Sequence, residues 1–367
     1  MPGLLLYNTT IPEKRLEWAL APFFGLGSGS PAGIGDAHYN FYPEANFIQR
    51  LTLGANFRSF HYASNQPFDT RLRYARLQPY LRINLAKPAA SNLYHTIQLR
   101  AIFLSQERLG FTGSGEFAGT QWRQSAIQEF SFQSERRSAI NPYNWRAALE
   151  HQAYDNPFGQ AQRYLKASLE WEGNYTYQRK RNISLRLFGG AFLQHSERKA
   201  GYIAPGAFNL ISQGFNDYRF DDFYLGRTDT DGPWLQQVSI RDGGFKNVIG
   251  SGFSLGRSNS FIIAANLKAD LPRNLVSWLP LKPYFDIGYF DNAMPTGAED
   301  TFSDQLLWSG GLMLGVFNDA IAVYFPLINS QNIQDRHAER GSYWKRVAFS
   351  IDMDRFNPWK LVDRLEF

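Results

Sequence analysis

The stretch Leu165-Lys166-Ala167-Ser168-Leu169-Glu170-Trp171 decides the fold class, because apolar and polar side chains alternate along it without a break. Successive side chains of an extended strand point to opposite faces. One face of this stretch is therefore apolar, and the opposite face carries Lys166, Ser168 and Glu170. A period of two predicts a β-strand with one apolar and one polar face.

The same alternation recurs along the chain, which indicates an all-β protein. Apolar side chains occupy every second position in four further stretches, residues 51–57, 97–103, 183–187 and 347–353. Aromatic residues gather at strand ends, as in Phe23-Phe24, Tyr175 and Tyr289-Phe290. A soluble sandwich would also alternate, but rings with a polar tip are typical of the headgroup level of a membrane. The pattern therefore favours a transmembrane β-barrel.

Composition agrees with one large barrel. The chain has 367 residues, of which 44% are hydrophobic and 16% aromatic. No stretch approaches the roughly 18–20 consecutive apolar residues that a spanning helix needs, and no linker divides the chain. We expect a transmembrane antiparallel β-barrel of about sixteen strands over residues 1–356. Residues 357–367 should form a short C-terminal tail.

The connections alternate in length, which is the pattern of bacterial outer-membrane barrels. Short turns are expected at residues 11–14, 43–46, 156–159 and 318–319, and longer polar connections at 109–122, 197–206, 292–304 and 329–345. The expected location is the bacterial outer membrane. The expected partners are outer-membrane lipid or lipopolysaccharide, the barrel assembly machinery during insertion, and other envelope proteins.

The last strand, from Val347, is expected to carry the insertion signal for that machinery. Its members are the apolar and aromatic residues Phe349, Ile351, Met353 and Phe356.

The sequence shows no apparatus for catalysis, metal binding or cofactor binding. There is no cysteine, and none of the six histidines lies in an HExxH motif. The glycine-rich stretches lack the Lys-Ser/Thr of a phosphate loop, and there is no G-x-S-x-G elbow. The net charge of +5 is scattered rather than clustered with aromatic residues, so no nucleic-acid partner is expected.

One constellation stands apart, the string Val238-Ser239-Ile240-Arg241-Asp242-Gly243-Gly244-Phe245 after the long irregular stretch 213–236. It resembles the loop motif of the BamA and two-partner-secretion transporter superfamily. The resemblance covers residues 210–356. It implies a long extracellular loop that folds back into the barrel, with its tip arginine paired to an acidic residue on a later strand.

The string Lys282-Pro283-Tyr284-Phe285-Asp286-Ile287-Gly288 resembles the strand motif that supplies this acid, aromatic-x-Asp-x-Gly. The resemblance thus implies an Arg241–Asp286 pair, and a bidentate Arg–carboxylate contact is strong and directional. The family has Arg-Gly-aromatic, whereas here Asp242 and two glycines separate Arg241 from the aromatic residue. The expected loop latch comprises Arg241, Gly243, Gly244, Phe245, Asp286 and Gly288.

The variant Ile240-Arg241-Asp242-Gly243-Gly244-Phe245-Lys246 is more specifically similar to the C-terminal barrel of gluzincin metallopeptidases of the aminopeptidase N type from Bacteroidetes. Residues 3–8 and 19–25 are also similar to the start of those barrels. The resemblance implies that a zinc site lies upstream, outside these residues. Because the first residues do not read as a signal peptide, we expect a periplasmic or catalytic domain to precede the barrel.

Three functions remain open. The first is a membrane anchor for a larger envelope protein, with the zinc metallopeptidase as the candidate. The second is translocation or insertion of polypeptides, and the third is a diffusive porin. An outer-membrane hydrolase would need a Ser/His pair at one rim, and none is visible. Conductance in planar bilayers separates the three. The absence of current favours an anchor, a small flickering current favours a plugged transporter, and a large steady current favours a porin.

Overall fold

The computed structural model describes residues 2–8, 14–26, 29–44, 47–113, 115–156, 159–179, 181–195, 198, 202–227, 232–249, 255–272, 280–293, 305–317 and 319–353. The chain divides into two compact units. The first comprises Met1–Ser134, Ala148–Tyr154 and Arg227–Thr230, and the second comprises Glu135–Ala147, Asp155–Gly226 and Asp231–Phe367.

The first part of the chain is a meander of strands, most of them long. Its strands are β1 (Leu6–Tyr7), β2 (Leu16–Gly25), β3 (Ser30–Phe41), β4 (Ile48–Asn65), β5 (Thr70–Leu85), β6 (Leu93–Phe111), β7 (Phe117–Arg136) and β8 (Tyr143–Asp155). A 3-10 turn, η1 (Gln66–Phe68), joins β4 to β5. β1 to β6 pair in chain order, each antiparallel to the next.

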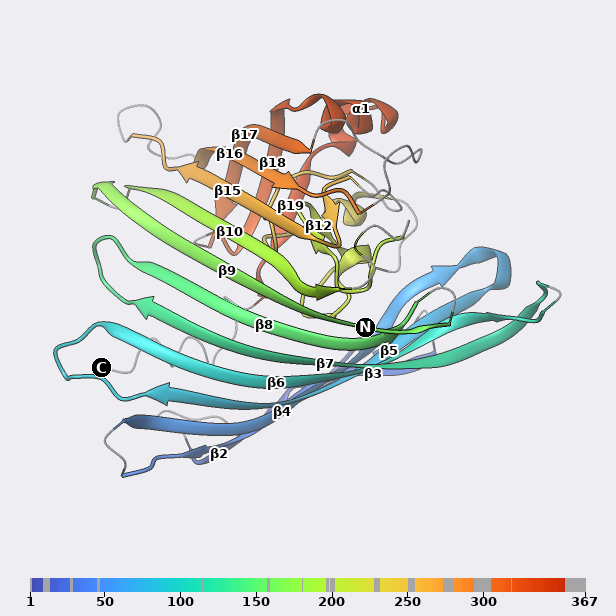
Figure 1. Cartoon of the computed structure of the whole chain (residues 1–367), viewed down its shortest axis with the longest axis horizontal. Helices are drawn as coiled ribbons and strands as arrows, with labels where there is room; N and C mark the ends of the chain where they lie inside the picture. Colours follow the sequence, from blue (N-terminus) through green and yellow to red (C-terminus); the bar gives the residue numbers. More distant parts are fainter. Residues whose placement is uncertain are drawn as a thin grey trace. The chain divides into compact units, whose positions relative to one another are not determined.

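The second part of the chain continues the meander and adds a large inserted loop. Its strands in the large sheet are β9 (Ala161–Gln178), β10 (Arg181–His195), β15 (Phe261–Ala269), β16 (Leu281–Phe290), β17 (Leu306–Val316), β18 (Ile321–Asn329) and β19 (Ala348–Ile351). Figure 1 shows β9, β10 and β15 as neighbours, and β16, β17, β18 and β19 follow in the order of the sheet. The loop between β10 and β15 holds β11 (Phe208–Asn209), β12 (Ser212–Gln213), η2 (Gly214–Asn216), η3 (Pro233–Gln236), β13 (Val238–Ser239) and β14 (Arg257–Ser258).

The predicted fold class is confirmed: among the described residues, fifteen strands form one sheet in the order β1 to β10, then β15 to β19. The expectation of about sixteen strands was close. The described residues contain one α-helix, α1 (Gln331–Glu339), and a further 3-10 turn, η4 (Tyr343–Lys345). The part of the chain that the structure describes has no helix long and apolar enough to cross a membrane.

One expected long connection is shorter in the structure, and another contains a helix. Residues 109–122 were predicted to be a long polar connection, but β6 runs to Phe111 and β7 begins at Phe117. The connection between them is short: the Gly115 N–H donates to the Thr112 carbonyl at 2.9 Å, and the ring centroids of Phe111 and Phe117 are 6.3 Å apart. The connection 329–345 contains α1, whose buried residues Ile333 and His337 are one helical turn apart.

The alternation read from the sequence places polar residues on the buried face of the sheet and apolar residues on the exposed face. β5 buries Tyr74, Arg76 and Gln78, while Leu77 on the opposite face is exposed. Cross-strand register lines up the apolar residues of this face into rows, such as Phe57–Leu77–Phe103 and Leu53–Leu81–Leu99. A water-soluble sheet would show the reverse polarity.

A close approach of side chains requires a glycine at position 54. A Cβ there would lie 2.5 Å from Tyr80 Cζ and 2.7 Å from His38 Cβ, on the two neighbouring strands. We expect Gly54→Val to lower the free energy of unfolding by about 1–3 kcal/mol through overpacking. Urea unfolding of the chain refolded in detergent measures this. Gly189→Val is the matched control, because the nearest atom to a Cβ there is 4.0 Å away. Equal effects of the two changes would contradict the packing argument.

Candidate functional site

In the second unit, polar residues on four neighbouring strands are cross-strand partners and form a row. Arg186 on β10 is opposite Asn266 on β15, Asn266 is opposite Asp286 on β16, and Asp286 is opposite Ser309 on β17. Directly opposite residues of an antiparallel sheet point to the same face. The four side chains therefore form one polar row on the buried face, and the register of the strands builds it.

The loop between β10 and β15 lies on this row. Arg186 Nη2 donates to the carbonyl of Asp242 at 2.7 Å, and Asn266 Nδ2 donates to the carbonyl of Gly243 at 2.9 Å. Members of the row are also hydrogen-bonded to each other. Arg186 Nη1 donates to Asn266 Oδ1 at 3.0 Å, and Asn266 Nδ2 donates to Asp286 Oδ1 at 3.0 Å. Side chains of three neighbouring strands thus hydrogen-bond to one segment of the loop.

The strongest contact is an ion pair between Lys246 of the loop and Asp286 of the wall. Lys246 Nζ lies 2.5 Å from Asp286 Oδ1, and the Lys246 backbone N–H donates to Oδ2 at 3.1 Å. The Asp286 side chain is fully buried and the Lys246 side chain is 5% exposed. Burial lowers the pKa of the Lys246 ammonium, and the Asp286 carboxylate opposes this shift. Both charges depend on each other for solvation.

The predicted glycines and Phe245 make the close approach of loop and strand possible. Phe245 is fully buried, and a Cβ at Gly288 would lie 3.0 Å from its ring and 2.7 Å from Leu210 Cδ2. A Cβ at Gly243 would lie 2.7 Å from Leu210 Cα. Gly244 has a φ of +65°, a conformation that glycine adopts without cost. The structure thus brings Gly243, Gly244, Phe245, Asp286 and Gly288 together.

The predicted Arg241–Asp286 pair is not formed. Arg241 Nε donates to Asp222 Oδ2 at 2.6 Å, and its Nη1 lies 3.9 Å from Asp221 Oδ2. The physical reason is the turn that follows Arg241, closed by Gly244 N–H donating to the Arg241 carbonyl at 2.9 Å, with Asp242 at a φ of +45°. Lys246, two residues after this turn, points to Asp286 instead. Arg241 joins two segments of the loop, and Lys246 joins the loop to the wall.

A second lysine holds another part of the loop. Lys166 on β9 donates through Nζ to the carbonyl of Gly206 at 2.8 Å and to the hydroxyl of Tyr218 at 2.7 Å. The same ammonium lies 4.7 Å from the ring centroid of Phe208 and 4.8 Å from that of Tyr218. Cation–π contacts of this kind gain strength where water is excluded. The loop is therefore fixed at both of its ends.

The loop also reaches the last strand. Gln237 forms an isolated parallel bridge with Phe349 of β19, and the rings of Trp234 and Phe349 are 6.1 Å apart. Of the predicted insertion signal, Phe349 and Ile351 lie on one face of β19, and Met353 follows the strand and is exposed. Phe356 and the tail 357–367 lie outside the described residues.

Sequence reasoning missed Lys246, Asn266 and Arg186. A signal for all three was present. Lys246 follows the motif aromatic Phe245 directly, and Arg186 and Asn266 occupy polar positions within otherwise apolar alternation. The strand register that aligns them could not be read from one sequence. In the part of the chain that the structure describes, no group of three His, Cys, Asp or Glu side chains could hold a metal ion.

Two solved structures are similar to this chain in fold. BamA from Haemophilus ducreyi lacking POTRA domains 1–3 aligns with 12% identity and a TM-score of 0.42, over 89% of this chain and 65% of that chain. CdiB from Acinetobacter baumannii aligns with 9% identity and a TM-score of 0.40, over 90% of this chain and 54% of that chain. The chain thus spans less than two thirds of either protein. No protein-family model matches the chain, and no curated protein sequence matches it.

The buried pair gives a prediction for stability. Asp286→Ala leaves the Lys246 ammonium buried without a counter-charge, so we expect the free energy of unfolding to fall by about 3–5 kcal/mol. Arg241→Ala breaks a pair whose arginine is 36% exposed, and such pairs contribute about 0–1 kcal/mol. Urea unfolding of both variants in detergent is the measurement. A larger loss for Arg241→Ala would show that the arginine is the principal latch.

Proposed function

We propose that the chain is a transmembrane β-barrel of the bacterial outer membrane, with the loop between β10 and β15 held inside it. The single observation that carries this proposal is the inverted polarity of the sheet. Charged side chains such as Arg76, Lys166 and Asp286 are buried, while large apolar side chains on the opposite face are exposed, Leu169 and Ile263 each by 55%.

A sheet face exposed to water would not carry this many apolar side chains. Soluble monomers rarely expose contiguous apolar patches beyond a few hundred square ångströms, whereas here apolar rows such as Leu185–Leu267–Phe285 run across neighbouring strands. Lipid does explain it, since the outer face of a membrane barrel is an apolar band. A sheet in hydrocarbon must also close, because an unpaired edge has no water to bond.

The lengths of the connections between strands also support an outer-membrane barrel. In the second unit the long connections 196–260, 291–305 and 330–347 follow β10, β16 and β18, which run in the same direction. The shorter connections 179–180, 270–280 and 317–320 lie at the opposite ends of those strands. Long loops at the extracellular end and short turns at the periplasmic end are the outer-membrane arrangement.

For the role of the barrel we propose a membrane anchor within a larger envelope protein. Releasing the loop would separate Lys246 from Asp286 and expose Phe245 and Leu210, which are fully buried. Each of these apolar side chains contributes about 1.5–3 kcal/mol by its burial. A loop held this firmly favours a barrel that stays closed. The proposed partners are outer-membrane lipid or lipopolysaccharide, and the barrel assembly machinery during insertion.

The resemblance of Ile240–Lys246 to gluzincin-associated barrels extends the proposal to a zinc metallopeptidase as the anchored protein. The residues that set this variant apart all have a place at the site. Asp242 accepts the Asn209 backbone N–H at 3.0 Å, and Lys246 pairs with Asp286. The catalytic part would then be carried outside these 367 residues.

Translocation or insertion of polypeptides is the second candidate, as the resemblance to the BamA and two-partner-secretion superfamily implies. It is favoured by the fact that one loop segment, 241–246, makes the contacts to the polar row. A single displaceable segment could open a path. A porin is disfavoured because the same segment occupies the buried face.

Conductance of the purified chain in planar bilayers separates these roles. An anchor with a latched loop should be silent, and Asp286→Ala should introduce flickering current as the loop loosens. Small flickering events in the unmodified chain would make translocation the leading role. A large steady conductance would contradict the latched loop itself.

The membrane assignment predicts a dependence on depth. Leu187, near the middle of β10, is exposed on the apolar face, and Ile183 lies on the same face near the start of the strand. An arginine facing lipid costs about 2–4 kcal/mol at the bilayer midplane and about 0–1 near the interface. We therefore expect Leu187→Arg to destabilise the chain in lipid vesicles more than Ile183→Arg. Equal and small costs would speak against a lipid-facing sheet.

A further inference from the structure

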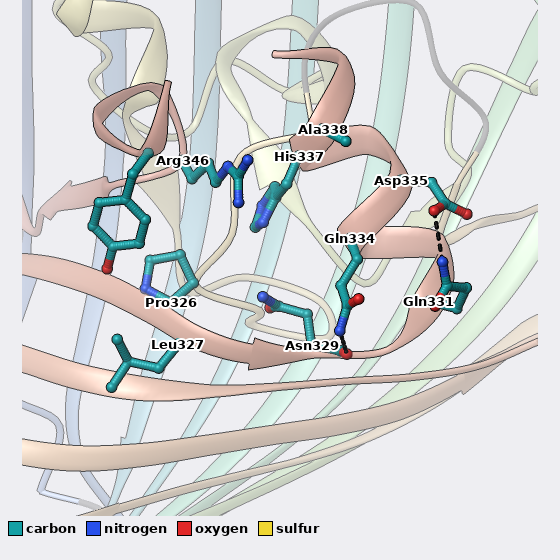
Figure 2. A pocket seen from close by; sticks show the side chains of 10 residues that line it. Pro326, Leu327, Asn329, Gln331, Gln334, Asp335, His337, Ala338 and Arg346 are labelled. Carbon is teal, nitrogen blue, oxygen red and sulfur yellow. Dashed lines mark hydrogen bonds between the residues drawn. The ribbon is translucent and has the colours of Figure 1, made fainter. Parts of the chain in front are cut away.

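A hollow lies between the end of β18, helix α1 and the turn η4, and its residue Asn329 is opposite Ser309, the last member of the polar row. It has a volume of about 450 Å³. Figure 2 shows residues from these three elements around it, among them Pro326, Asn329, Gln334, His337 and Arg346. A volume of this size accommodates a small ligand or a headgroup.

Three buried polar atoms of this pocket lack a hydrogen-bond partner among the residues that the structure describes. They are His337 Nε2, Arg346 Nε and Asn329 Oδ1. The His337 residue is 1% exposed, so its ring nitrogen is hidden from bulk water. A buried polar group without a partner costs free energy, and a ligand that supplies the missing partner would recover it.

The pocket is electropositive where these atoms lie. Figure 2 shows the Arg346 guanidinium beside the His337 ring, whereas Asp335 is turned to Gln331, to which it is hydrogen-bonded at 2.7 Å. Burial, followed by the charges of Arg346 and Arg340, lowers the pKa of His337 to about 4. The ring is therefore neutral at neutral pH and can offer one N–H beside a fixed cation.

We propose that this pocket binds a phosphate group, with Arg346 Nε and His337 Nε2 as donors to its oxygens and Asn329 Oδ1 as acceptor from a hydroxyl on the same ligand. A phosphate presents several acceptor oxygens and pairs strongly with a guanidinium. A cation would meet Arg346, and an apolar ligand would leave all three polar atoms without partners.

The position of the pocket indicates the source of the phosphate, and this step rests on the proposed membrane function. Leu327 and Ile328, at the end of β18, are 60% and 55% exposed, and Trp344 in η4 is 70% exposed. An apolar strand end beside an exposed tryptophan is typical of the membrane–water interface. The pocket thus lies at headgroup level, where lipid phosphates are concentrated. A soluble phosphate compound is the alternative source.

The experiment titrates inorganic phosphate into the full chain, refolded in a neutral detergent, and measures the heat of binding by isothermal titration calorimetry. We expect saturable binding that Arg346→Gln and His337→Gln each weaken about tenfold or more. Arg336→Gln is the matched control. Arg336 lies on α1 next to His337, but its side chain pairs with Glu339 at 3.0 Å and is not among the residues that line the pocket. No binding, or an equal loss in the control, overturns the proposal. If Arg346→Gln does not fold, His337→Gln carries the test.

A second arm identifies the source of the ligand. The chain is inserted into vesicles of phosphatidylcholine with a small fraction of phosphatidic acid, and the lipid that stays with it after detergent extraction is analysed. Enrichment of phosphatidic acid that Arg346→Gln abolishes supports a lipid headgroup. Binding of inorganic phosphate without enrichment supports the site but overturns the lipid source. A chain that binds phosphate but does not insert refutes the membrane function alone, and one that inserts but binds no phosphate refutes the site alone.

Discussion

The buried pair of Lys246 and Asp286 joins the long loop to the wall of the sheet and determines where the loop lies. Its 2.5 Å contact is supported by Asn266 and by the backbone N–H of Lys246. Neither charge has access to water that could replace its partner, so the pair stabilises one position of the loop. Phe245 then packs where Gly288 leaves room, and the loop backbone aligns with the polar row.

The same alternation of residues serves both sides of the sheet. On the apolar face Leu185, Leu267 and Phe285 lie opposite one another, and on the buried face Arg186, Asn266 and Asp286 do the same, one residue along each strand. A shift of register by one residue would exchange these faces. The strand pairing that presents an apolar surface therefore also assembles the polar row, and fold and site cannot be separated.

The sequence predicted the strands, because period-two alternation is a local property. The resemblance of two short strings to known motifs also singled out Asp286, Gly288 and Phe245. It failed at Arg241, since the inserted Asp242 and second glycine change the direction of the chain after the arginine, and only the folded turn shows that Lys246 faces Asp286. The pocket near α1 was also beyond reach, because His337 and Arg346 meet through a helix and a turn.

Whether the barrel anchors a partner or passes polypeptides, the loop must stay on the buried face at rest. Hydrogen–deuterium exchange of the full chain in lipid nanodiscs tests this most directly. The amides of Phe245 and Lys246, bonded to Leu210 and Asp286, should exchange as slowly as those in the middle of β16. Exchange as fast as in the exposed turn after β4 would contradict the account, since the loop would then leave the wall freely.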